Sequence, residues 1–241
     1  EVVAWVSSLS ILLSTLFYLG ALIVYLTYAK SGRMWHLAAV WGLFLLALLA
    51  KSSAATLPLV LVVIDLYLGR RPVRRVLLEK APFVLLSVVF GVIAVYARGG
   101  AGHLQDFALR YSLPERVCIV SYSCLWYAGK LLYPTNQSVF YPFPSKPEGW
   151  LPISFYLAPL ILAALAVGIW FGGRHRRLLA FATLFMVASL VLVIQVVPIS
   201  ELMVCDRYAY VPCIGLFFLF GTLIVRIASR GLAWRAVTLA F

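Results

Sequence analysis

Two cations stand where long apolar stretches end, and both side chains are suited to binding a phosphate group. Lys51 lies at the turn of a very short hairpin between two apolar stretches, and Arg207 precedes the last one. Tyr208 and Tyr210 flank the arginine. A charge beside a membrane segment is costly and marks a functional site by default, and a guanidinium presents a planar fork to phosphate oxygens. We therefore predict that both cations bind a phosphate; the alternative for Lys51 is a lysine that extends to the membrane surface and anchors the hairpin.

Three carboxylates accompany these cations. Asp206 comes directly before Arg207, at the predicted start of a helix, where an acid acts as a cap and interacts favourably with the helix dipole. For Asp206 this structural role and a role in substrate binding both remain open. Asp106 and Glu201 are external carboxylates and candidates for a general base, although most acids in loops are only solvated.

A segment rich in aromatic residues and proline lies between the two cations in the sequence. It comprises residues 129–134 and 139–144, in which proline follows tyrosine or phenylalanine and restricts the backbone to an extended form. We predict a rigid, aromatic-lined cover at the depth of the lipid headgroups, in which Lys130 and Tyr141 contact a sugar or a lipid chain. The alternative is an ordinary aromatic belt at the membrane surface.

The composition indicates an integral membrane protein. Of the 241 residues, 64% are hydrophobic and 12% are charged, and the mean hydropathy is +1.01. Soluble domains carry about 25% charged residues. The net charge of +12 lies mostly in short gaps between apolar stretches, which fits membrane orientation better than nucleic-acid binding. The four cysteines have no spacing typical of a metal site, and we interpret Cys118, Cys124, Cys205 and Cys213 as structural.

Seven apolar stretches are candidates to cross a bilayer, whose core requires about 20 helical residues. They are 8–29, 35–50, 53–68, 82–97, 152–171, 178–197 and 208–226. Short loops rich in lysine and arginine stay on the cytoplasmic side. Most of the 20 lysines and arginines lie in four such segments: 30–36, 69–80, 172–177 and 226–235. These segments therefore orient the helices.

The segment 98–151 is expected to form one long excursion on the outer face. If the apolar part 117–133 crossed the bilayer, the basic segment 172–177 would lie outside, against the charge bias. We therefore predict that 117–133 is an interfacial or re-entrant helix. Its tyrosines and Trp126 suit that depth, and Lys130 can extend to water.

The predicted fold class is all-α, a polytopic transmembrane helical bundle that forms a single domain over residues 1–241. It has about seven spanning helices plus the interfacial or re-entrant helix. The chain opens at Glu1 without a methionine or a signal peptide, and it closes on apolar residues 234–241 that look like the start of another helix. We expect the domain to be incomplete at both ends.

Four stretches match, in order, the pattern of one family. They are Val3–Ser7 with Leu13–Phe17; Leu49–Lys51 with Thr56–Pro58 and Asp65; Gly129–Pro134 with Val139–Pro142; and Asp206–Pro212 with Ile214–Leu216. The chain resembles the membrane part of bacterial TPR-repeat-containing glycosyltransferase-like proteins. These are similar to the eukaryotic transmembrane and TPR-repeat-containing O-mannosyltransferases of the GT-C superfamily.

The resemblance implies a site on the extracytoplasmic face of a multi-pass protein of the bacterial inner membrane. The donor would be a sugar on a polyprenyl phosphate, and the acceptor would be a protein or a glycan. The resemblance implies no cofactor and does not exclude a divalent metal. The phosphate would be bound by Lys51 and Arg207. The other substrate contacts would come from the candidates Asp206, Tyr208, Tyr210, Tyr141 and Lys130.

The family's catalytic acid lies in an external loop that would precede Glu1, and its TPR array would follow the last residue. One departure is that Ser8-Leu9-Ser10-Ile11 replaces a charged turn of the bacterial relatives, so any contacts made by those charges are lost or replaced here.

Two other functions remain open. A transporter or lipid flippase would line a pathway with the same charges, but the expected pair of similar halves is not visible in the sequence. A non-catalytic membrane scaffold for a TPR domain is the third possibility, favoured if the upstream loop lacks its acid.

Overall fold

The computed structural model describes residues 9–69, 73–97, 110–135, 138, 141–146, 149–194 and 202–228. The predicted all-α class is confirmed for this part of the chain, because the regular structure is helical apart from one short strand pair. The α-helices are α1 (Leu9–Ser31), α2 (Met34–Ala50), α3 (Leu57–Leu68), α4 (Val73–Ala97), α6 (Leu113–Leu132), α7 (Ile153–Trp170), α8 (Arg176–Leu190) and α9 (Cys213–Ala228). Short elements are the 3-10 helices η2 (Ser52–Thr56), η3 (Gly173–His175) and η4 (Asp206–Ala209), with strands β1 (Tyr141–Pro142) and β2 (Leu202–Val204).

A helix is found in each of the seven apolar stretches, but two helices begin elsewhere than predicted. Helix α4 begins at Val73 and contains Pro82, so the second half of the predicted basic loop 69–80 is helical. Arginine, glutamate, lysine and leucine are good helix formers, which explains the extension. Helix α9 begins only at Cys213, because residues 206–209 form the separate turn η4.

Among the described residues, three helices are long and apolar enough to cross a membrane, judged by length and composition: α1, the Val76–Ala97 part of α4, and α7. The helices Met34–Ala50, Ser52–Leu68 and Cys213–Arg226 are apolar but shorter. Large aliphatic side chains such as Leu16, Leu85 and Leu160 are exposed on the long helices. An apolar outer surface of this kind is typical of helices that face lipid. The number of crossings, predicted as seven, stays a prediction.

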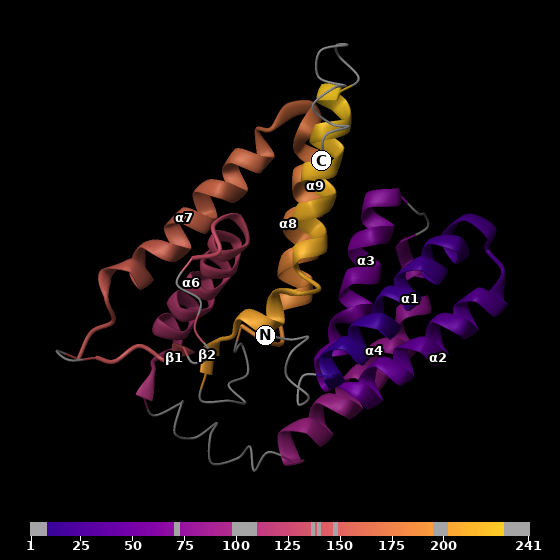
Figure 1. Ribbon diagram of the computed structural model, residues 1–241, viewed down its shortest axis with the longest axis horizontal. Helices are drawn as coiled ribbons and strands as arrows, with labels where there is room; N and C mark the ends of the chain where they lie inside the picture. The colour runs from indigo at the N-terminus through magenta and orange to yellow at the C-terminus, as the bar shows by residue number, and fades with distance from the viewer. Residues whose placement is uncertain are drawn as a thin grey trace.

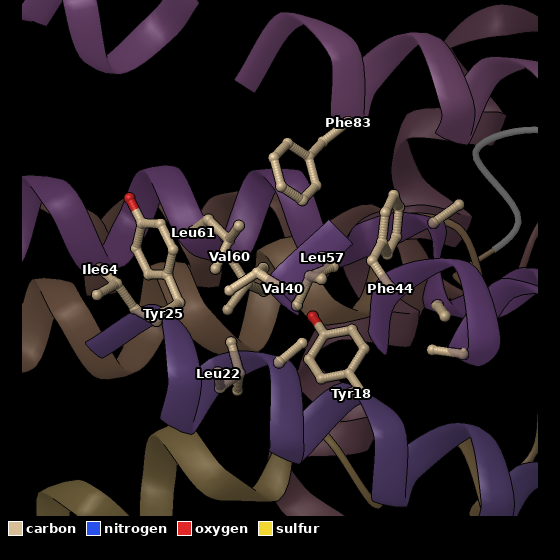
Figure 2. Close-up of a cluster of buried hydrophobic side chains, with 14 of the residues drawn as sticks. Tyr18, Leu22, Tyr25, Val40, Phe44, Leu57, Val60, Leu61, Ile64 and Phe83 are labelled. Atoms are coloured by element: carbon tan, nitrogen blue, oxygen red, sulfur yellow. The ribbon is translucent and has the colours of Figure 1, made fainter. Parts of the chain in front are cut away.

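The first four helices form a bundle with a shared core (Figure 1). Helices α1 and α2 make an antiparallel hairpin, whose turn uses Gly32 in the left-handed conformation, with φ of +66°. Figure 2 shows Tyr18, Phe44, Leu57 and Phe83, from four different helices, around this core. These side chains are almost completely buried. The bundle places Lys51, at the end of α2, next to the start of η2 and α3.

A second core lies between α6, α7, α8 and β2, and α8 also contacts α3 and α9. Phe185 of α8 belongs to the first core, whereas its neighbour Met186 and Leu190 belong to the second. Helix α9 can lie close to α8 because Gly215 has no side chain: a Cβ atom there would be 2.7 Å from the Ala182 carbonyl oxygen. In Figure 1, α8 and α9 stand between α7 and α3.

A charged network is buried inside the first bundle. Lys80 Nζ of α4 lies 2.8 Å from Asp65 Oδ2 of α3, and each side chain is 2% exposed. The Tyr25 hydroxyl of α1 donates a hydrogen bond to the same carboxylate oxygen at 2.5 Å and accepts one from Lys80. Glu79 Oε2 lies 3.6 Å from the ammonium. Buried charges are tolerated only when paired, so this network fastens three helices together.

Candidate functional site

The candidate site forms around the turn that joins β2 to α9. Strand β2 pairs antiparallel with β1, which opposes Tyr141 to Val204 and Pro142 to Leu202. This pairing brings the aromatic-proline segment beside η4, which carries Asp206 and Arg207. Lys51 reaches the same turn from the first bundle. The structure thus brings together residues that are far apart in the sequence.

Lys51 is half-buried at the end of α2. Its backbone is extended, with φ of −161°, and its amide donates a hydrogen bond to the Ala47 carbonyl at 2.9 Å. The ammonium nitrogen lies 5.2 Å from the centre of the Tyr208 ring. A cation over an aromatic face is held by the ring's quadrupole. The lysine therefore contacts the turn that carries Arg207 and Tyr208, and its binding of a phosphate stays a prediction.

Arg207 and Tyr208 line a small cavity of about 40 Å³ with mixed polar and apolar walls, between the first bundle and η4. The Arg207 Nε donates a hydrogen bond to the Cys205 sulfur at 2.8 Å, which fixes part of the guanidinium. Tyr210 also lines the cavity. Its other walls carry the hydroxyl groups of Ser14, Thr15, Tyr18, Ser53, Thr56 and Ser189. A cavity of this size with several hydroxyl groups in its walls has room for a few water molecules or a small polar group.

The prediction that Asp206 opens the last helix is wrong, because Asp206 lies in the first turn of η4 and α9 begins only at Cys213. The Asp206 carboxylate oxygen Oδ2 accepts a hydrogen bond from the Tyr141 hydroxyl at 3.2 Å. That hydroxyl also accepts a bond from the Ser138 amide, and burial raises the pKa of Tyr141. Tyr141 therefore stays protonated at neutral pH and serves as a donor.

Lys130 lies beside Tyr141 at the end of α6. Its ammonium is 5.4 Å from the Trp126 ring centre and 5.9 Å from that of Tyr141, and it donates a hydrogen bond to the Thr135 carbonyl. The two rings meet edge to face, 4.8 Å apart. Lys130, Tyr141 and Asp206 thus form one chain of contacts leading to η4.

Tyr127 is a structural residue of the site whose contact the sequence did not indicate. Its buried hydroxyl accepts a hydrogen bond from the Cys205 amide at 2.9 Å and donates one to the Cys205 carbonyl at 3.0 Å. One side chain therefore contacts both backbone groups of the residue before η4, and the carbonyl also accepts a hydrogen bond from the Tyr208 amide at 3.0 Å. No local signal identifies this contact, because its partner lies 78 residues away.

We expect Tyr127→Phe to loosen the turn that carries Asp206 and Arg207. It leaves the buried Cys205 amide without its partner, at a cost of about 1–3 kcal/mol, whereas the Cys205 carbonyl still accepts a hydrogen bond from the Tyr208 amide. Thermal unfolding of the purified protein measures the loss. Tyr122→Phe is the matched control, because Tyr122 lies on the same helix and packs through its ring, stacked 4.1 Å from Phe155. Equal stability of the two variants would contradict the role of the Tyr127 hydroxyl.

The other end of α6 is held by a salt bridge. Lys146 Nζ lies 2.7 Å from Glu115 Oε1 and donates a hydrogen bond to the Arg110 carbonyl at 2.9 Å. Glu115 also forms a capping box with Ser112 at the start of the helix. The bond from Lys146 lowers the pKa of Glu115, so the contact is complete at neutral pH and weakens on acidification through that lowered pKa. The predicted helix 117–133 therefore begins earlier, at Leu113.

Within the described ranges, no group of three or more histidine, cysteine, aspartate or glutamate side chains is placed to hold a metal ion. The four cysteines are free thiols. The candidate bases Asp106 and Glu201 lie outside the described residues, as does the whole segment 98–109.

No family model, no curated protein and no solved structure matches this chain. The family resemblance of its motifs therefore stays a prediction.

Proposed function

We propose that this chain is the membrane part of a GT-C-type glycosyltransferase of the bacterial inner membrane. It transfers a sugar from a polyprenyl-phosphate donor to a protein or glycan acceptor on the extracytoplasmic face. The observation that carries the proposal is the meeting of Lys51 with Tyr208, beside Arg207 and the cavity that Arg207 and Tyr208 line. Lys51 comes from the end of α2, and the other two come from η4.

The two cations fit the chemistry of a phosphate leaving group. When the bond between the sugar and the phosphate breaks, negative charge grows on the phosphate oxygens. Fixed positive charge beside those oxygens stabilises the transition state more than the ground state. The Tyr208 ring holds the Lys51 ammonium, and the hydrogen bond to the Cys205 sulfur holds the Arg207 guanidinium. Both cations are therefore in place before the reaction, which favours this effect.

The contact chain Lys130–Tyr141–Asp206 supports a role in covering the substrates. Tyr141 and Trp126 offer ring faces for stacking, and the Asp206 carboxylate can accept hydrogen bonds from sugar hydroxyls. Tyr210 lies at the same cavity. The catalytic acid is expected on a loop before Glu1.

Donor turnover by the complete protein tests the proposal. The purified protein is reconstituted in proteoliposomes and given polyprenyl-phosphate-linked sugars one at a time, and loss of donor and labelled acceptor are followed. Glycosyl transfer yields free polyprenyl phosphate and a labelled acceptor. Movement of an intact donor between leaflets would instead identify a flippase, and no change in any donor would favour the scaffold.

The proposed topology places the basic loops on the cytoplasmic side and the site on the other side. Single cysteines introduced as Arg74→Cys and Arg176→Cys should react only from the cytoplasmic face of sealed vesicles, and Pro142→Cys only from the opposite face. Membrane-impermeant maleimide applied to each side measures this in a protein without its native cysteines. Labelling of position 142 from the cytoplasmic side would contradict a single external excursion over 98–151.

A further inference from the structure

An open apolar groove runs between α3, α4 and α8. Its volume is about 840 Å³, and its walls are almost entirely aliphatic. They are formed by Leu59, Val62, Val63, Leu77, Ala81, Val84, Leu85, Val88, Leu184, Val187, Ala188 and Val191. The charged residue in the wall, Lys80, has its ammonium paired with buried Asp65. A groove of this chemistry fits a flexible hydrocarbon chain.

Two walls of the groove carry an exposed cation at the same end. On α4, Arg74 stands about one helical turn before the lining residue Leu77. On α8, Arg177 stands at the helix start, about two helical turns before the first lining residue Leu184, and its guanidinium donates a hydrogen bond to the Tyr67 carbonyl at the end of α3. The groove is therefore apolar along its length, and positive charge lies at the starts of α4 and α8. Lys51 lies at the opposite end of α3, before η2.

We infer that this groove binds one anionic phospholipid of the leaflet at the basic end. An acyl chain lies against the aliphatic walls, and the phosphate with its anionic headgroup meets Arg74 and Arg177. Charge complementarity selects this occupant over a neutral lipid, because basic pockets between membrane helices attract anionic headgroups. The lipid is distinct from the proposed donor, whose phosphate would lie at the other end of α3. The inference thus goes beyond the proposed function and does not depend on glycosyl transfer.

The lipid retained by the purified full chain tests the inference. The protein is placed in nanodiscs of phosphatidylcholine, with and without phosphatidylglycerol, and then released for native mass spectrometry. We expect one phosphatidylglycerol to remain bound through delipidation, and the thermal unfolding midpoint to rise only in the discs that contain it. Equal retention of the two lipids, or retention of neither, would overturn the inference.

A pair of groove variants separates this site from general contact with lipid. Val84→Trp fills the groove and should abolish the retained phosphatidylglycerol. Val92→Trp is the matched control: it lies on the same helix outside the groove lining, and the two valines are 45% and 49% exposed. If Val84→Trp retained the lipid as well as Val92→Trp does, the groove would not be its site.

The cations are tested in the same way. Arg74→Gln and Arg177→Gln should each weaken phosphatidylglycerol retention about fivefold, since a cation near an anionic surface contributes about that factor. Arg177→Lys keeps the charge and should retain most of the lipid, which distinguishes headgroup binding from the contact with Tyr67. Lys30→Gln, an exposed cation at the end of α1, should have no effect. Equal losses in all of these variants would contradict a specific headgroup site.

Discussion

Asp65→Ala is expected to destabilise the first bundle by about 3–5 kcal/mol, because it leaves the Lys80 ammonium without its buried counter-charge. The lysine is 2% exposed, and its two other described contacts are the Tyr25 hydroxyl and Glu79 at 3.6 Å. Neither replaces a carboxylate oxygen at 2.8 Å. The unfolding free energy of the purified protein in detergent, measured with denaturant, gives the effect.

Two controls show whether burial is the cause. The double variant Asp65→Leu with Lys80→Met replaces the pair by apolar side chains and should recover much of the lost stability. Lys146→Ala breaks the more accessible salt bridge to Glu115 and leaves the capping box of α6 in place, and here we expect a loss of about 1 kcal/mol or less. If Asp65→Ala were as mild as Lys146→Ala, the charged network would not fasten α1, α3 and α4.

Lys51→Ala and Arg207→Ala should each reduce donor use by the complete protein about ten- to a hundredfold. The loss of a charge-assisted contact to a phosphate costs about 1.5–3 kcal/mol, and both cations lie at the same turn. Arg207→Lys should recover only part of the activity, because an ammonium cannot both contact the Cys205 sulfur and present a forked pair of donors. Initial rates with a saturating and a limiting concentration of polyprenyl-phosphate sugar measure the effect.

Thermal unfolding must be recorded beside these rates, because the Lys51 ammonium also contacts the Tyr208 ring. Lys30→Ala, at the far end of the α1–α2 hairpin, is the matched control and should keep full activity. Folded variants of Lys51 and Arg207 that consume the donor as fast as the parent would show that these cations only anchor the turn.

The sequence predicts those features of the fold that depend on one continuous segment of the chain. Apolar stretches of sufficient length mark the helices, and the first bundle follows them closely from Leu9 to Leu68. The residue types around Lys51 and η4 also identified side chains that the fold brings together. The sequence places the start of α4 too late, because charged residues in the first turns of a helix resemble those of a basic loop.

Long-range partners could not be predicted in the same way. The residue type of Tyr127 predicts an interfacial depth, but it does not predict that the hydroxyl contacts the backbone of Cys205. Asp65 and Lys80 show no local pattern that pairs them, because the contact depends on how α3 and α4 pack. Nor does the composition of residues 141–142 predict a strand, since its hydrogen-bonding partner comes from residues 202–204.

The position of α8 has a mechanical consequence. Phe185 and Met186 are neighbours on this helix, yet they pack into different cores. A rotation of α8 that repacks one core therefore displaces a side chain of the other, because close-packed interiors leave no room for independent adjustment. Helix α8 therefore couples the packing of the α1–α4 bundle, which carries Lys51, to the packing of the half of the chain that positions Arg207.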